Sequence, residues 1–367
     1  MVCKRDPTCA LRWPTWALCA VTLGGGSLCA QDGSKPAPGQ AETRRSVATQ
    51  PAKTEGPGLA VHYPGDRGIT GHPAVLFATG FESGVDGGMK RRRKGVEILE
   101  DPEVAHTGKS CARITATRGK DTGGDLVYEW KKGVDRCFLR FYCKFDPKTV
   151  TPHHFVHLGG HMPTYKYRFG GGAGIRPPGG ADGKFGTTIE PPDLDRAPDG
   201  RKGWMFYTYW HEMRSWQTPQ GESAGKPNAW YGNNFLADHQ RPFVGRGRWI
   251  CVEILLHVNR IGQHDGQQAV WIDGRKVGHW GPGYPVGSWI RDRFVTSGSW
   301  NKKPAPFEGF SWRTDERLKI RRAMLQWYVS DRAARKGKAD ENIVYFDNVV
   351  IATEYIGPLA IERTKGP

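Results

Sequence analysis

Several segments of this chain alternate apolar and polar residues, a pattern typical of β-strands whose two faces meet different surroundings. From residue 139 to residue 145 the odd positions are apolar, while Arg140, Tyr142 and Lys144 occupy the even positions. The segment 249–259 shows the same alternation with its apolar residues at even positions. Both segments therefore predict strands that are buried on one face.

Further strands are expected at 324–329 and 343–352, and residues 269–277 predict a hairpin with Asp273-Gly274 at its turn. Many antiparallel strands with one apolar face each predict two packed sheets. The abundance of turn-forming residues agrees, because the 367 residues include 49 Gly and 26 Pro. The expected fold class is all-β, a two-sheet antiparallel β-sandwich.

The alternation over residues 204–212 gathers one kind of chemistry on a single face. In an extended strand Tyr207, Tyr209 and His211 project together, whereas the intervening Phe, Thr and Trp point the other way. A row of phenols and an imidazole on a sheet face is what a sugar-binding or sugar-cleaving cleft needs. This strand is the strongest functional signal in the sequence.

The chain divides into a leader, a linker, one large domain and a short tail. Residues 1–30 combine a basic start with an apolar, small-residue stretch, which predicts a secretory signal peptide. Residues 31–70 are polar and rich in Gly and Pro, and are expected to be a disordered linker. The β-sandwich domain is expected over 71–360, followed by a tail at 361–367. No other stretch is apolar over the about 20 residues that span a bilayer, so a secreted, periplasmic or cell-surface protein is expected.

The net charge of +16 predicts a polyanionic partner or a generally basic surface. Nucleic acid is not favoured, because the basic residues are scattered rather than interleaved with aromatics on one face, and because the N-terminus predicts export. The densest basic run, residues 90–94, is either a solvated loop or an anion contact.

Four of the eight cysteines fall within the expected leader. Export permits a disulfide among the others, and buried free thiols are the open alternative. No CxxC or Cys/His spacing suggests zinc. The cysteines that would remain after cleavage are Cys111, Cys137, Cys143 and Cys251.

Six stretches spread over residues 75–358 share their pattern with a known superfamily. They are Val75–Gly84, Ala105–Ile114, Arg140–Asp146, Gly247–Glu253, Trp271–Gly274 and Val344–Val350. Together they resemble the concanavalin A-like, laminin-G-type jelly-roll superfamily, and within it exported bacterial proteins related to polysaccharide lyase family 14. The superfamily includes lectins, glycosidases, lyases and non-catalytic modules, so the resemblance implies a jelly roll more specifically than an activity.

The resemblance implies β-elimination on an acidic, uronate-containing polysaccharide as the leading activity. Such a lyase neutralises the uronate carboxylate, removes the adjacent C5 proton and protonates the leaving oxygen. We expect His211 as the base, Tyr209 as the acid or an alternative base, and Arg140 and Lys144 as the neutralising cations. The structural alternative is that these residues form a rim or a solvated strand face.

Substrate-binding residues are expected beside this group and in aromatic loops, because exposed rings stack on sugars through their apolar faces. The Gly/Pro-rich stretch 159–200 is typical of binding loops. The histidine cluster 153–157 with His161 is a second catalytic candidate or a metal site, since His153 and His157 would share a strand face and could bind one metal ion. The candidate binding residues are Tyr142, Tyr207, Trp216, Trp230, Tyr231, His257 and His157.

The resemblance further implies a structural calcium between the first and last strands, held by Glu82 and Asp347. The alternative is that both are ordinary acids at strand ends. No organic cofactor is expected.

A glycoside hydrolase needs two carboxylates about 5–10 Å apart, and no expected strand carries a Glu-x-Asp-x-x-Glu motif or a similar one. Elimination is therefore favoured over hydrolysis. The main rival is a non-catalytic glycan-binding or cell-surface module of the same fold, which would carry stacking aromatics without an acid–base pair.

Overall fold

The computed structural model describes residues 56–85, 88–164, 183–191, 193–194, 203–218, 229–236, 245–299, 301–337 and 339–360. These residues belong to one compact unit, Ala52–Pro367. The expected signal peptide (1–30), most of the expected linker and the expected tail (361–367) lie outside the described residues. None of the helices in the described ranges combines the length and the apolar character that crossing a membrane requires.

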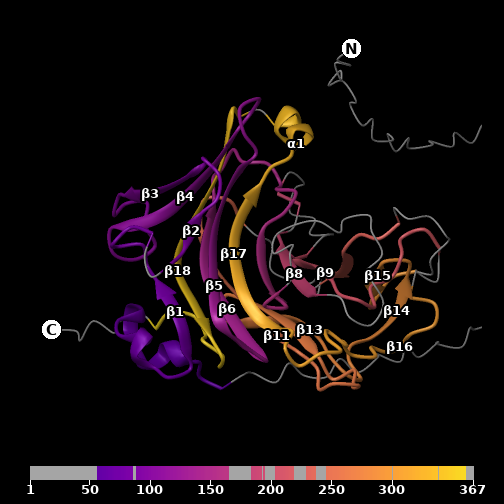
Figure 1. Ribbon diagram of the computed structural model, residues 1–367. Helices are drawn as coiled ribbons and strands as arrows, with labels where there is room; N and C mark the ends of the chain where they lie inside the picture. The colour runs from indigo at the N-terminus through magenta and orange to yellow at the C-terminus, as the bar shows by residue number, and fades with distance from the viewer. Residues whose placement is uncertain are drawn as a thin grey trace, which may run out of the picture. The chain divides into compact units, whose positions relative to one another are not determined.

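Within the described ranges, one sheet, here called sheet A, has eight antiparallel strands in the order β13-β12-β11-β6-β18-β4-β3, with β1 also paired to β18. The C-terminal strand therefore lies inside the sheet and not at its edge (Figure 1). The strands are β1 (Val75–Thr79), β3 (Val96–Glu100), β4 (Ser110–Thr117), β6 (Arg136–Phe145), β11 (Trp249–His257), β12 (Gln267–Ile272), β13 (Arg275–Trp280) and β18 (Glu341–Ala352).

The other sheet, sheet B, has ten strands among the described residues, in the order β16-β14-β15-β10-β9-β8-β7-β17-β5-β2. The pairing of β10 with β15 is parallel. The strands are β2 (Lys90–Arg91), β5 (Gly123–Val134), β7 (Val156–His161), β8 (Lys184–Glu190), β9 (Met205–Tyr209), β10 (Asn233–Leu236), β14 (Val286–Ile290), β15 (Arg293–Val295), β16 (Ala305–Pro306) and β17 (Lys319–Tyr328).

The main hydrophobic core contains the inward-facing residues of both sheets. Phe141 and Ile254 of sheet A belong to the same buried cluster as Leu325 and Phe206 of sheet B. In β6 and in β11 alternate residues belong to this cluster, as the alternation requires. The two-sheet, mostly antiparallel β-sandwich expected from the sequence is confirmed.

The Asp273-Gly274 hairpin is also confirmed. It joins β12 to β13, and both turn residues have positive φ, 49° at Asp273 and 78° at Gly274. That is the geometry that an Asp-Gly pair favours between two twisted strands.

Residues 56–71 differ from the expectation of a disordered linker. They form three short 3₁₀ turns, η1 (Leu59–His62), η2 (Pro64–Asp66) and η3 (Ile69–Gly71). Leu59 and Ile69 are buried in a second apolar cluster together with Phe138 of β6 and Ile356 beyond β18. The few apolar residues of this segment do not recur with the period of a strand or a helix. Its packing could therefore not be predicted from the hydrophobic pattern of the sequence. The segment covers part of the outer face of sheet A, the face turned away from the main core.

The only α-helix in the described ranges is short, α1 (Asp331–Lys336), and follows β17. Ser330 caps it by accepting a hydrogen bond from the backbone N–H of Ala333. Figure 1 shows this helix at the end of β17.

Candidate functional site

The outer face of sheet B, turned away from the core, carries a row of polar side chains at matched register. Tyr207 of β9 lies opposite Thr188 of β8, and Thr188 lies opposite His157 of β7. Glu190 lies two residues beyond Thr188 on the same face. His154 precedes β7 and forms an isolated bridge with Tyr328 at the end of β17. Residues from four segments of sequence thus meet on one surface.

Tyr207 and Tyr209 project together, as the alternation predicts. Their hydroxyl oxygens are 3.2 Å apart and their rings meet edge to face. Burial raises the pKa of both phenols. Gly232 packs closely against the Tyr207 ring, since a Cβ at this position would lie 2.8 Å from its carbons. The pair is therefore fixed in place and protonated at neutral pH, ready to donate a hydrogen bond or a proton.

His154 and Glu190 form the second part of the site. Nδ1 of His154 lies 3.0 Å from Oε1 of Glu190, and the Glu190 side chain is buried. The His154 ring lies beside Tyr207, with the ring centroids 5.5 Å apart. When Nδ1 donates to the carboxylate, the lone pair is on Nε2. A carboxylate that orients an imidazole in this way prepares Nε2 to act as a base.

A hydrogen-bonded network continues from this pair across β17 to β5. His157 contacts Thr188 Oγ1 through Nδ1 and Gln326 Oε1 through Nε2, both at 2.8 Å. Gln326 in turn donates to Asp125, and Arg93 donates to both carboxylate oxygens of Asp125 at 3.0 and 2.7 Å. Burial lowers the pKa of His157 to about 3, so this histidine stays neutral and acts as a structural link.

His211 lies just beyond the strand that was expected to carry it. β9 ends at Tyr209, and a turn follows in which Met213 N–H donates to Trp210 O. His211 Nε2 is 3.3 Å from Ser311 Oγ, and the side chain is half-buried. Its expected role as the base stays a prediction. His154, in contrast, has a carboxylate, that of Glu190, which orients its ring.

The aromatic residues after β9 are less available than expected. Trp230 is buried in the main core, which leaves it unable to stack on a sugar. Trp216 is half-buried and packs against the same core, and Tyr231 is half-buried. Most of the expected binding stretch 159–200 lies outside the described residues.

Arg140 and Lys144 are on the other side of the sandwich from Tyr209, so the expected grouping of these residues is wrong. Both project from the outer face of sheet A. Arg140 is fully buried and pairs with Asp66 at 2.6 Å beneath η2, and Lys144 donates to Val104 O at 2.7 Å. The period-2 pattern identified a polar strand face but could not tell to which sheet the face belonged.

Tyr142 and His257 share this outer face of sheet A. Tyr142 is buried, stacks on His106 and accepts a hydrogen bond from the backbone N–H of Leu359. His257 lies on β11 and pairs in register with Arg136 of β6. Neither residue reaches the tyrosine pair, and Tyr142 is covered by His106 and by the segment at Leu359.

The expected calcium ligands Glu82 and Asp347 both accept backbone N–H groups of the segment 106–110. Asp347 Oδ2 accepts from His106 and Thr107, and Glu82 Oε1 accepts from Lys109 and Ser110. Across the described residues, no three His, Cys, Asp or Glu side chains come together in an arrangement that could hold a metal ion. Both carboxylates thus already accept hydrogen bonds from backbone N–H groups, an arrangement that fits a cation poorly. Calcium binding stays a prediction.

The four cysteines of the domain are buried free thiols. Of the two possibilities left open by the sequence, the structure shows this one. The alternative metal pair of His153 and His157 has no third ligand of these types within the described ranges.

Glu190 was missed by the sequence analysis, and His154 was included only as a member of the histidine cluster 153–157. Glu190 ends an alternating stretch in which Phe185, Thr187 and Ile189 face the core. That alternation was the available signal, but the surrounding glycines and prolines favoured a loop. The pairing with His154 follows from the register of β7 with β8, which sequence alone does not specify.

No protein-family model and no curated protein matches this chain. Solved structures similar to it include an alginate lyase from Chlorella virus, vAL-1, with 13% identity, a TM-score of 0.47, and coverage of 77% of this chain and 100% of that one. An endo-β-1,4-glucuronan lyase from the fungus Trichoderma reesei has 14% identity, a TM-score of 0.43, and coverage of 76% and 95%.

The marine PL-14 alginate lyase from Aplysia kurodai has 14% identity, a TM-score of 0.41, and coverage of 77% and 92%. A PL-14 lyase is therefore among the solved structures to which this chain is similar. Identities and TM-scores this low transfer neither an activity nor the role of a residue, so the function rests on the side chains of this chain itself.

Proposed function

We propose that this protein cleaves an acidic, uronate-containing polysaccharide by β-elimination on the outer face of sheet B. The observation that carries the proposal is the juxtaposition of the Tyr207–Tyr209 hydroxyl pair with the His154–Glu190 pair. It supplies an oriented base and a protonated acid within one small area.

In this mechanism Nε2 of His154 takes the C5 proton of the uronate unit. The bond from C4 to the leaving oxygen breaks, a C4–C5 double bond forms, and the tyrosine pair, through Tyr209, gives its proton to the leaving oxygen. Glu190 stabilises the imidazolium that results. Each proton transfer by a positioned side chain typically contributes 10²–10⁴-fold to the rate.

The uronate carboxylate must be neutralised before the C5 proton can leave. Two guanidinium groups lie on the outer face of sheet B. Arg93 is held by Asp125 and lies 5.7 Å from the Tyr328 ring centre. Arg322 projects from β17, and burial lowers its pKa to about 10, so it remains charged at neutral pH. We assign neutralisation to these two residues in place of Arg140 and Lys144.

The proposal includes an anionic polysaccharide as the partner and export of the protein. The net charge of +16 supports the first. The composition of residues 1–30 supports the second.

The test is the absorbance near 235 nm, where an unsaturated uronate product absorbs, on a panel of alginate, glucuronan, pectate and glycosaminoglycans. We expect a steady rise on one of them, reduced at least about 100-fold in Tyr209→Phe and in His154→Gln. The matched control is His264→Gln, which removes an exposed histidine that also pairs with a glutamate, Glu212.

Equal loss in the His264→Gln control would contradict the assignment of His154 as the base. No absorbance change on any polymer, with saturable binding to one of them, would instead establish the non-catalytic glycan-binding module.

A further inference from the structure

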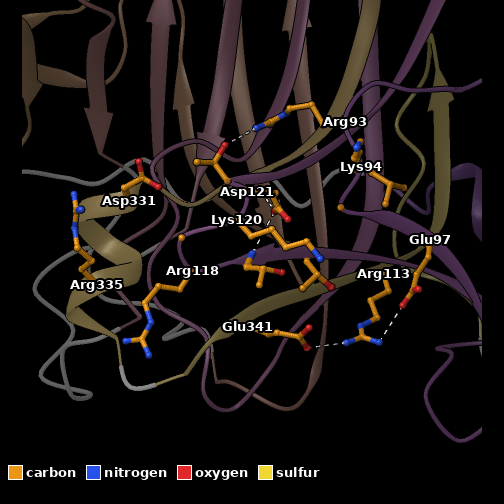
Figure 2. Close-up of a pocket in the computed structure, with 17 residues that line it drawn as sticks. Arg93, Lys94, Glu97, Arg113, Arg118, Lys120, Asp121, Asp331, Arg335 and Glu341 are labelled. Carbon is orange, nitrogen blue, oxygen red and sulfur yellow. Dashed lines mark hydrogen bonds and ion pairs between the residues drawn. The ribbon is translucent and has the colours of Figure 1, made fainter. Parts of the chain in front are cut away.

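A basic pocket lies where the β4–β5 turn joins the two sheets, and of its lining residues only Arg93 has a role in the proposed elimination. It has a volume of about 1020 Å³ and is formed by residues 93–97, strand β4, the β4–β5 turn, the start of β18 and helix α1. Six of its lining side chains are basic and four are acidic. Figure 2 shows Lys120 extending across the middle of the pocket, with Arg93 and Arg113 on opposite sides.

Most of the acidic groups in the pocket are already neutralised. Arg113 bonds to both Glu97 and Glu341, at 3.0 and 3.4 Å. Asp121 accepts the backbone N–H groups of Thr117 and Gly123. Three of the four lining carboxylates are therefore held by the walls of the pocket, and the exception is Asp331 at the start of α1.

Three cations of the pocket are uncommitted. Within the part of the chain that the structure describes, the side chains of Lys94, Lys120 and Arg335 are exposed and form no ion pair or hydrogen bond. They come from three separate segments, so the fold has gathered them at one place. Unpaired like charges in a concave surface raise the local concentration of anions.

Arg93 joins this pocket to the catalytic face. It lines the pocket, and its guanidinium also bonds to Asp125 and to Thr122 Oγ1. The Tyr328 ring has Arg93 at 5.7 Å on one side and the His154 ring at 6.0 Å on another. Only β17 separates β7 from β5 in sheet B, which corresponds to about 10 Å between the outer two strands. A sugar chain passing over Tyr328 would reach both places.

We propose that this pocket is a distal subsite for the polysaccharide, binding carboxylate- or sulfate-bearing units of the same chain whose cleavage occurs at Tyr209 and His154. The inference rests on the proposed function for the identity of the ligand. It gives a role to the basic run at 90–94, which supplies Arg93 and Lys94 to the pocket.

The test compares a triple variant, Lys94→Gln/Lys120→Gln/Arg335→Gln, with the wild type on the long polymer and on short oligosaccharides of the same sugar. The KM for the polymer is expected to rise about tenfold, because each lost charge contact weakens binding two- to threefold. The kcat and the KM for short oligosaccharides, which do not reach the pocket, are expected to stay unchanged.

The matched control is Arg275→Gln/Lys302→Gln/Lys303→Gln, which removes the same charge from exposed positions outside the pocket. An equal rise in KM in this control, or an equal effect on short oligosaccharides, would overturn the subsite. Affinity electrophoresis in a gel containing the polymer separates the two proposals. Pocket-dependent retention without any cleavage would reject only the lyase activity, and cleavage with pocket-independent retention would reject only the subsite.

Discussion

His157 is a half-buried, neutral histidine in the middle of the sheet B network, and desolvation lowers its pKa to about 3. In an unfolded chain a histidine titrates near pH 6.5. Between these values the unfolded chain binds a proton that the folded chain does not. The unfolding free energy must therefore fall as the pH decreases from about 6.5 towards 3.

We expect His157→Gln to flatten this dependence by up to about 1.4 kcal/mol per pH unit. Urea unfolding at several pH values between 7 and 4 measures the slope. Thr188→Val is the matched control, because it removes a hydrogen bond to His157 but keeps the titrating ring. A slope that is the same in His157→Gln and the wild type would show that this histidine is protonated in the folded protein.

The individual residues of the site also show how much of it could be predicted from the sequence. Tyr207 and Tyr209 were predictable, because period-2 alternation within one strand places them on one face. The partners His154 and Glu190 were not, because they meet only through the register of two other strands. Arg140 and Lys144 were wrongly grouped with Tyr209, since alternation is identical on the outer faces of both sheets.

At the scale of elements, the 3₁₀ turn η2 supplies the partner of a fully buried arginine. Asp66 is the ion-pair partner of Arg140, and two guanidinium nitrogens of Arg140 have no hydrogen-bond partner. Removing one member of a buried pair leaves an uncompensated charge, which typically costs about 3–5 kcal/mol. The segment 56–71 therefore has a structural role that its composition does not reveal.

We expect Asp66→Asn to lower the unfolding free energy by about 3 kcal/mol. Asparagine suits this position because Asp66 has a φ of 58°, which Asn tolerates. The control is Glu97→Gln, which disrupts a half-exposed pair with Arg113 and should cost less than about 1 kcal/mol. Equal losses in urea unfolding would show that the burial of Arg140 does not depend on η2.

The strands themselves were the most predictable elements. β6, β11 and the β12–β13 hairpin lie where alternation and the Asp-Gly turn place them, because one apolar face per strand is enough to specify an extended element. The short edge strand β2 and the residues of β8 had no comparable pattern. β8 has glycines and prolines on both sides, which obscured its alternation.

At the scale of the whole molecule, the four domain cysteines are free and buried although the protein is expected to be exported. Burial raises the pKa of all four thiols, to about 12 for Cys111 and Cys251. Thiolates are the reactive form of cysteine, so these buried and protonated thiols react only after the sandwich unfolds.

For protein beginning at residue 31, we expect four thiols to react with a chromogenic disulfide reagent at pH 8 in denaturant and none to react in the folded state over the same time. The number of thiols that react also tests directly whether any two of the cysteines form a disulfide. Two reactive thiols in denaturant without reductant would mean that a disulfide had formed, contrary to the structure.

The central position of β18 in sheet A governs when the protein can fold. β18 separates β6 from β4 and also pairs with β1. Without it, sheet A is divided into β13-β12-β11-β6, β4-β3 and β1. The first turns of the domain likewise bond to Tyr355 and Ile356 near its end. Contacts between such distant parts of a chain close late, because the loop entropy must be overcome first. A chain in which β18 has not yet been synthesised therefore cannot complete this sandwich.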